Sequence, residues 1–208
     1  MYLYGASGHG KVIKEILEAQ SISIDAFVDD DQGISQLCGI PILHYCEGLT
    51  PMIVSIGINR TRKKIVEKLS CQFMTAIHPT AIVSPSAIIG EGTVVMPGAI
   101  INADAVIGKH CIVNTGASID HECVIGDYCH IAPHVTLCGQ VHVGEGTLIG
   151  AGAAVVEDVL DNATVVGVPA KLLKIRDLST LTKVVVGGNL LIIKMLQKPQ
   201  AERSCHAA

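Results

Sequence analysis

The sequence predicts an α/β chain in two parts: a small Rossmann-like domain, then a longer three-sided coil of short parallel strands. Two observations support this fold class. Residues 1–75 alternate apolar runs with segments of helical spacing, which is typical of a parallel βαβ arrangement. From residue 77 onward an aliphatic residue returns at every sixth position, a period that neither a helix nor a hairpin strand produces.

Composition excludes several classes of function. Of 208 residues, 49% are hydrophobic but only 3% are aromatic, so we expect a large aliphatic core. A net charge of −4 gives no reason to expect nucleic acid or an anionic membrane as a partner. No signal-like segment opens the chain, and the most apolar window, 184–196, is too short for stable membrane insertion. We therefore expect a cytoplasmic protein whose eight cysteines are reduced thiols.

The elements of the first domain follow in order. A short strand at "MYLYG" precedes a helix with apolar residues at 12, 13, 16 and 17. A second strand ends in Asp29 and Asp30, and a third lies in "PMIVSIG". The basic segment after it predicts a second helix, with Asn59 as its N-cap.

The glycine-rich turn "GASGHG" at 5–10 joins the first strand to the first helix. Glycines there let a phosphate approach the backbone N–H groups of a helix N-terminus. The spacing is GxxGxG rather than GxGxxG, so it disfavours NAD. Asp29 and Asp30 follow about twenty residues later, where an acid can bind ribose hydroxyls. A nucleotide site is one interpretation, and a tight turn with solvated acids is the other.

Two residue columns define the second part. Every sixth residue from Ile77 to Val155 is aliphatic, and four positions later, from Ala81 to Val159, every residue is small or β-branched. Coils of three six-residue units, stacked about 4.8 Å apart, would place the aliphatic column inside. This hexapeptide pattern resembles the left-handed parallel β-helix family over roughly 77–171. The handedness follows from the resemblance, because the general preference for right-handed crossovers predicts the opposite.

The cysteines of this part fall in the small-residue column, at Cys111, Cys123 and Cys129. We interpret them as small buried hydrophobic residues. No CxxC or HxxxH spacing supports zinc, so no metal is expected.

His121 is the strongest catalytic candidate. It occupies an outward corner position beside Glu122, and Gly139, eighteen residues later, is expected to stack under it. Imidazole can accept a proton near neutral pH, and an adjacent carboxylate can fix its tautomer and raise its basicity. No Ser or Cys nucleophile is paired with it, which favours direct attack by the acceptor. His130 replaces an aliphatic residue at a repeated position, which suggests local use.

Several segments together resemble one bacterial family: "YGASGHG", the acids at 29–30, "IGINRTRKK", "SIDHECVIGDYCHIAP" at 118–133 and "VGVPAK" at 166–171. It is the sugar acetyltransferase family of surface-glycan biosynthesis, with UDP-4-amino-sugar N-acetyltransferases and sialic acid O-acetyltransferases as members. The resemblance covers residues 1 to about 173. It implies a homotrimer with acetyl-CoA in the groove between neighbouring coils.

The resemblance also implies roles for individual residues. His121 matches the general base and Glu122 the carboxylate that supports it. The positions that match the acetyl-CoA site are His130, Gly139, Ala151 and Gly167. Those that match the acceptor's nucleotide-binding loops are Ser7, Gly8, His9, Asp29, Asp30, Gly57 and Asn59. The glycine turn then becomes a UDP-amino-sugar site.

Three domains are expected: the Rossmann-like acceptor domain at 1–75, the β-helix at 76–173 and a C-terminal tail at 174–208. Family chains usually end soon after "GVPAK", so the tail is a departure. Packing on the end of the coil, or a contact with a partner or membrane surface through residues 190–193, are its two interpretations.

The leading function is acetyl-CoA-dependent N-acetylation of the 4-amino group of a UDP-linked amino-deoxy sugar. The first alternative is O-acetylation of sialic acid or a related sugar. A non-catalytic β-helix scaffold is the alternative of another class, and it needs neither His121 nor Glu122. A γ-carbonic anhydrase would need zinc histidines at a spacing that the sequence lacks.

Overall fold

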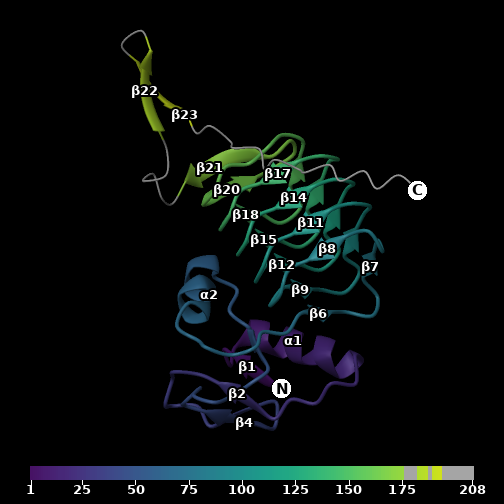
Figure 1. The fold of residues 1–208 in the computed structure, drawn as a ribbon, viewed down its shortest axis with the longest axis vertical. Coiled ribbons are helices and arrows are strands. Elements are labelled where there is room, and N and C mark those ends of the chain that lie inside the picture. The colour runs from purple at the N-terminus through teal and green to yellow at the C-terminus, as the bar shows by residue number, and fades with distance from the viewer. Residues whose placement is uncertain (176–181, 187–188, 194–208) are drawn as a thin grey trace, which may run out of the picture. The chain divides into compact units, whose positions relative to one another are not determined.

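The computed structural model describes residues 1–175, 182–186 and 189–193. Residues 1–175 belong to one compact unit, and the described residues that follow them belong to a second. Within the first unit a small α/β part is followed by stacked coils (Figure 1). The predicted fold class, Rossmann-like at the N-terminus and a left-handed β-helix after it, is confirmed.

The N-terminal part is a five-stranded sheet with the order β3-β4-β2-β1-β5. Its strands are β1 (Tyr2–Tyr4), β2 (Ala26–Val28), β3 (Gln36–Leu37), β4 (Ile40–Leu43) and β5 (Met52–Val54). Both neighbours of β1 are parallel to it, as the alternating pattern predicts, and β3 adds an antiparallel edge. The helices are α1 (Gly8–Ala19) and α2 (Asn59–Val66).

The expected N-cap of α2 is wrong. Asn59 is the first helical residue, and Ile58 caps the helix without a side-chain hydrogen bond. The Asn59 amide is instead committed to carbonyl groups of the coils, described below.

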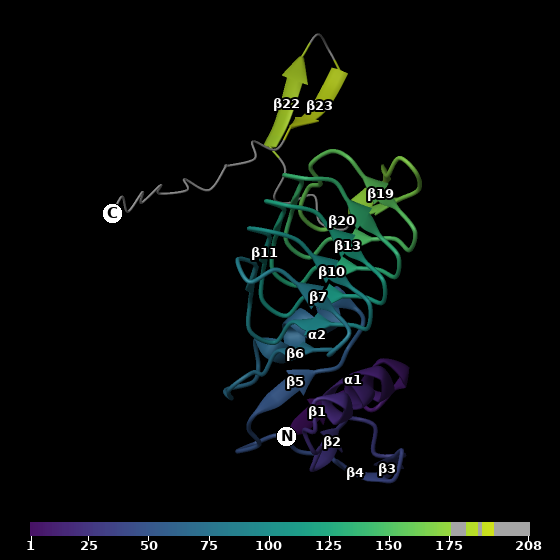
Figure 2. The same ribbon diagram turned by 90° about the vertical axis from the view of Figure 1, so that its right-hand side faces the viewer.

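The coils have three faces, each a parallel sheet. The first face holds β6 (Ala76–Ile77), β9 (Val94–Val95), β12 (Ile112–Val113), β15 (His130–Ile131), β18 (Leu148–Ile149) and β20 (Ala163–Val166), with β21 (Lys171–Ile175) antiparallel to β20. The second holds β7 (Ile82–Val83), β10 (Ile100–Ile101), β13 (Ser118–Ile119), β16 (Thr136–Leu137) and β19 (Ala154–Val155) (Figure 2). The third holds β8 (Ile88–Ile89), β11 (Val106–Ile107), β14 (Val124–Ile125) and β17 (His142–Val143).

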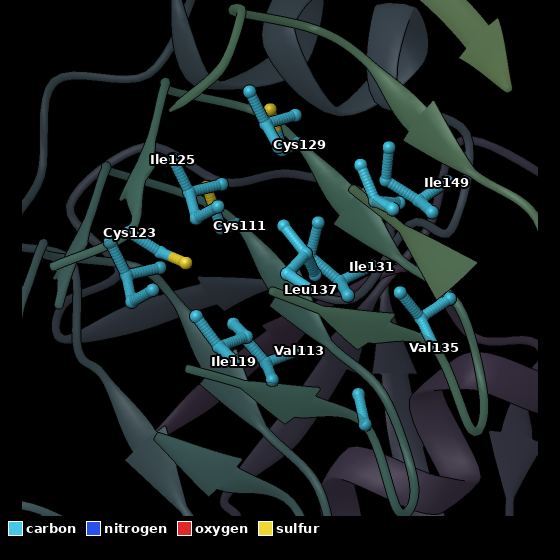
Figure 3. Close-up of a cluster of buried hydrophobic side chains, with 14 of the residues drawn as sticks. Cys111, Val113, Ile119, Cys123, Ile125, Cys129, Ile131, Val135, Leu137 and Ile149 are labelled. Atoms are coloured by element: carbon cyan, nitrogen blue, oxygen red, sulfur yellow. The ribbon is translucent and has the colours of Figure 1, made fainter. Parts of the chain in front are cut away.

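Paired residues on one face lie 18 positions apart, as Ile101 and Ile119 do, except that β18 pairs with β20 at a separation of 16. The aliphatic column therefore points inward on every face, and its members from Val95 to Val155 are buried (Figure 3). Cys111, Cys123 and Cys129 are buried too. Each of their thiols also donates a hydrogen bond to a backbone carbonyl of the following coil, at 3.1 Å.

The outer side of the first face is covered by the N-terminal part. Val94, Met96 and Ile112 share one buried cluster with Ile13 and Leu17 of α1. α1 contacts β6, the first strand of this face, and α2 lies beside the coils and reaches them through Arg62 (Figure 1).

The tail contains an antiparallel pair, β22 (Thr182–Val186) and β23 (Asn189–Ile193). Residues 176–181, 187–188 and 194–208 of the tail lie outside the described residues, so the two interpretations of the tail stay predictions. Neither helix of the described part is long and apolar enough to cross a membrane.

Candidate active site

His121 and Glu122 form a pair at the corner between β13 and β14. The His121 Nδ1 atom lies 3.1 Å from Oε2 of Glu122, and both side chains are 54% exposed. The expectation of an outward corner position is therefore correct. Since a carboxylate accepts hydrogen bonds, this contact places the proton of the neutral ring on Nδ1 and leaves Nε2 as the basic nitrogen.

Gln140, on the next coil, supports the carboxylate. Its Nε2 donates to the same Glu122 oxygen at 3.0 Å. This hydrogen bond, and secondly that of His121, lowers the pKa of Glu122, so the carboxylate is ionised at neutral pH. On the other side, Asp120 accepts the backbone N–H of His121 at 2.8 Å and the amide of Asn102 at 3.0 Å.

Gly139 lies directly against the His121 ring. A Cβ atom at position 139 would stand 2.6 Å from Nε2 and 2.7 Å from Cε1. Gly139 therefore stacks under His121, as predicted, and its lack of a side chain leaves room for the Nε2 atom of the ring. Two other positions matched to acetyl-CoA lie on turns further along the coils: Ala151 follows β18 on an exposed turn, and Gly167 follows β20 at φ +95°.

The glycine turn leaves the start of α1 open. Ser7 is the N-cap but makes no side-chain capping bond, and no acidic residue stands in the first turn. A Cβ on Gly5 or Gly10 would clash with the chain, whereas a Cβ on Gly8 would meet nothing within 4 Å. Packing therefore explains Gly5 and Gly10, and Gly8 is the one whose absent side chain leaves room for a ligand at the N–H groups.

The two acids after β2 differ. Asp29 accepts the backbone N–H of Ala6 at 2.7 Å and that of Asp31 at 3.0 Å, one on each oxygen. It therefore braces the glycine turn. Asp30 accepts the Tyr4 hydroxyl on Oδ1 at 2.7 Å. Burial and this contact raise the pKa of Tyr4.

A second cluster joins the two parts of the molecule. Nε2 of His130 on β15 lies 3.0 Å from Nδ2 of Asn114, and the His130 ring also hydrogen-bonds the backbone of Gly57. Because Oδ1 of Asn114 accepts the Thr115 N–H, its Nδ2 is the donor to His130. Burial, and secondly the charge of Arg62, lower the pKa of His130 to about 4.

His9 belongs to the same cluster. Burial, then the nearby His130 and Arg62, lower its pKa to about 4, and its buried Nε2 has no hydrogen-bond partner. Both imidazoles are therefore neutral at pH 7. The structure thus brings together His9, Gly57 and His130, while the bonds of His121 stay at its own corner and coil neighbours.

Sequence reasoning missed Arg62. The basic segment around it suggests a solvated helix, but its side chain is only 1% exposed and lies between α2 and the coils. Gln140 was missed as well, although its spacing of 18 from Glu122 could have revealed it. The described residues contain no group of three or more side chains suited to a metal.

The fold and the His121–Glu122 pair define the class of protein: a bacterial hexapeptide-repeat transferase. The family model for the PglD N-terminal domain matches residues 1–69, and that for the bacterial transferase hexapeptide matches 86–121, 104–139 and 122–157. A variant of perosamine N-acetyltransferase from Caulobacter crescentus, in complex with CoA and GDP-perosamine, has a TM-score of 0.75 at 36% identity, covering 83% of this chain and 96% of that chain. The acetyltransferase domain of PglB from Neisseria gonorrhoeae, in complex with acetyl coenzyme A, has a TM-score of 0.73 at 37% identity, covering 83% and 98%.

Among curated proteins, UDP-N-acetylbacillosamine N-acetyltransferase of Bacillus subtilis (strain 168) is 41% identical over 107 residues, which cover 45% of this chain and 50% of the relative. The match spans about half the length of that relative. With the two structural relatives matched over nearly their whole length, the chain belongs to the family of hexapeptide-repeat sugar N-acetyltransferases with a PglD N-terminal domain.

Proposed function

We propose that the protein transfers the acetyl group of acetyl-CoA to the 4-amino group of a nucleotide-linked amino-deoxy sugar in surface-glycan biosynthesis. The single observation that carries the proposal is the His121–Glu122 pair, whose geometry leaves Nε2 free above Gly139. The relatives support the substrate class, since one is named for a UDP-linked sugar and another binds GDP-perosamine.

The proposed reaction is a direct displacement. The amine nitrogen of the sugar bonds to the thioester carbonyl carbon, the carbon–sulfur bond breaks, and CoA leaves as the thiolate. His121 Nε2 takes the proton that the amine loses and returns it to the thiolate sulfur. Glu122 stays ionised and stabilises the imidazolium that forms meanwhile.

For the acceptor we propose the open start of α1 as the diphosphate site, with Ser7, Gly8 and His9 around it. Both Asp29 oxygens hold backbone N–H groups, so Asp30 is the better candidate for the ribose. Asp30→Ala should then raise the KM for the sugar nucleotide severalfold and leave that for acetyl-CoA unchanged. Asp29→Ala should additionally lower the thermal midpoint, because it frees the glycine turn.

For acetyl-CoA we propose a groove between neighbouring chains of a homotrimer, lined by Gly139, Ala151 and Gly167, with His130 near the thioester. Because its pKa is lowered to about 4, His130 is a weak base, which favours a hydrogen-bonding role over proton transfer. Light scattering that found an active monomer at working concentration would refute this assembly.

The deciding experiment is thiol release from acetyl-CoA with a panel of acceptors: UDP- and GDP-linked 4-amino sugars, and free sialic acids. We expect turnover with a nucleotide-linked amino sugar and loss of roughly 10²–10⁴-fold in His121→Ala, the usual worth of a positioned base. Glu122→Ala should cost less. Turnover with sialic acid alone would favour the O-acetyltransferase, and no turnover with any acceptor would favour a scaffold.

A further inference from the structure

Arg62 carries a guanidinium group that is buried without a carboxylate among its hydrogen-bond partners. Its side chain is 1% exposed and leads the largest fully buried side chains of the described residues. Nε donates to the His110 carbonyl at 2.7 Å. Nη2 donates to the Tyr128 carbonyl at 3.0 Å and the Cys129 carbonyl at 3.3 Å. One side of the guanidinium is therefore bound to two successive coils.

The other side of the guanidinium holds the loop before α2. Nη1 donates to the Ile56 carbonyl at 2.8 Å and reaches that of Gly57 at 3.4 Å, and Nη2 donates to Oδ1 of Asn59 at 2.9 Å. The Asn59 amide in turn donates to the carbonyls of Gly146 and Thr147, at 3.0 and 3.1 Å, on the next coil. The loop is thus tied to three consecutive coils at the same corner.

The position of the loop before α2 matters because this loop contacts His130. The residue after Ile56 is Gly57, whose backbone hydrogen-bonds the His130 ring, and a Cβ on Gly57 would meet nothing within 4 Å. Open space therefore lies beside Gly57, next to the cluster of His9 and His130 at which the loops of the proposed acceptor site reach β15. A planar guanidinium with five N–H donors can fix such a loop in orientation as well as in distance, which a lysine cannot.

We propose that Arg62 is a positioning residue for acetyl transfer, which holds the Gly57 loop of the acceptor site in register with the coil that carries His130. The inference rests on the proposed function. Its charge has a second effect, because it helps to lower the pKa of His9 and His130 and so keeps both rings neutral.

The test compares Arg62→Lys and Arg62→Met with the same changes at exposed Arg60, on the same helix. A lysine keeps the charge but not the fork, so kcat/KM for the sugar nucleotide should fall roughly 10–100-fold, the cost of a misplacement near 1 Å. The dissociation constant of acetyl-CoA should stay within about twofold. Arg62→Met should lose more, and the Arg60 variants should match the wild type. If Arg62→Met fails to fold, Arg62→Lys decides.

The second readout needs no turnover. The ring N–H proton of His130 should be visible by NMR in the wild type, because Gly57 and Asn114 hold the ring, and should broaden in Arg62→Lys. A wild type inactive on every acceptor would refute the proposed function and leave this measurement standing. An unchanged kcat/KM together with an unchanged His130 resonance in Arg62→Lys would overturn the inference. So would an equal loss of acetyl-CoA affinity, which would indicate a general role in folding.

Discussion

Replacement of Gly139 by alanine tests the base most directly. The added methyl group would lie 2.6 Å from His121 Nε2, so the ring must retreat by about 0.8 Å to reach an ordinary contact of 3.4 Å. The backbone at 139 is not in the left-handed region, so alanine adds no strain of its own. A shift near 1 Å costs about 10²-fold when it misplaces a reacting group. We therefore expect kcat to fall by roughly 10–100-fold.

The assay is thiol release at saturating acetyl-CoA, with the thermal midpoint as a control for folding. Because the ring is half exposed and free to move, stability should change by less than about 1 kcal/mol. A double-mutant cycle with His121→Ala separates the base from a direct effect on acetyl-CoA. If the methyl group acts through the ring, Gly139→Ala costs nothing further in the His121→Ala background. Native turnover in Gly139→Ala alone would refute the assignment of Nε2.

Two further changes concern pH. Gln140→Glu removes the hydrogen bond that does most to lower the pKa of Glu122 and adds a like charge beside it, so this carboxylate should be protonated at higher pH and the acid limb of the kcat/KM profile should move to higher pH. The same change at exposed Gln72 is the control, and an unmoved limb would contradict the reasoning. Burial holds the pKa of three imidazoles at about 4, below the ordinary 6.5: those of His9, His110 and His130. Below pH 6.5 the unfolded chain therefore binds more protons than the folded chain, so the free energy of unfolding should fall as the pH drops from 6.5 towards 4. The expected loss is about 2 kcal/mol per imidazole at pH 5. Equal urea midpoints at pH 7 and pH 5 would argue against this prediction.

The coils were predictable because their packing is periodic in sequence. One aliphatic residue in six fixes which side chains point inward, and a spacing of 18 then fixes what stacks on what, including Gly139 on His121. The start of the first helix was predictable too, because the glycine-rich turn at residues 5–10 comes directly before it in the sequence. In both cases the determining contacts repeat or lie close in sequence.

The junction between the two parts was not predictable in this way. Arg62 stands in a run of basic residues that suggests a solvated helix face. Its partners on the coils are backbone carbonyls 48 to 67 residues away, and a carbonyl leaves no mark in the sequence. The same holds for Asn59, which looks like a cap and is used as a bridge to residues 87 and 88 positions on.

One corner of the coils carries a column of small donors, each bonded to a carbonyl of the following coil. Its members are Thr75, Thr93, Cys111, Cys129 and Thr147. Both threonine and cysteine fill this position, so the coils are interchangeable there and the stack by itself could gain or lose a coil. Helix α2 removes that freedom, because its side chains Asn59 and Arg62 bind three particular coils. The number of coils between residues 110 and 147 is therefore fixed, because a coil inserted there would separate α2 from one or more of the carbonyls that it binds.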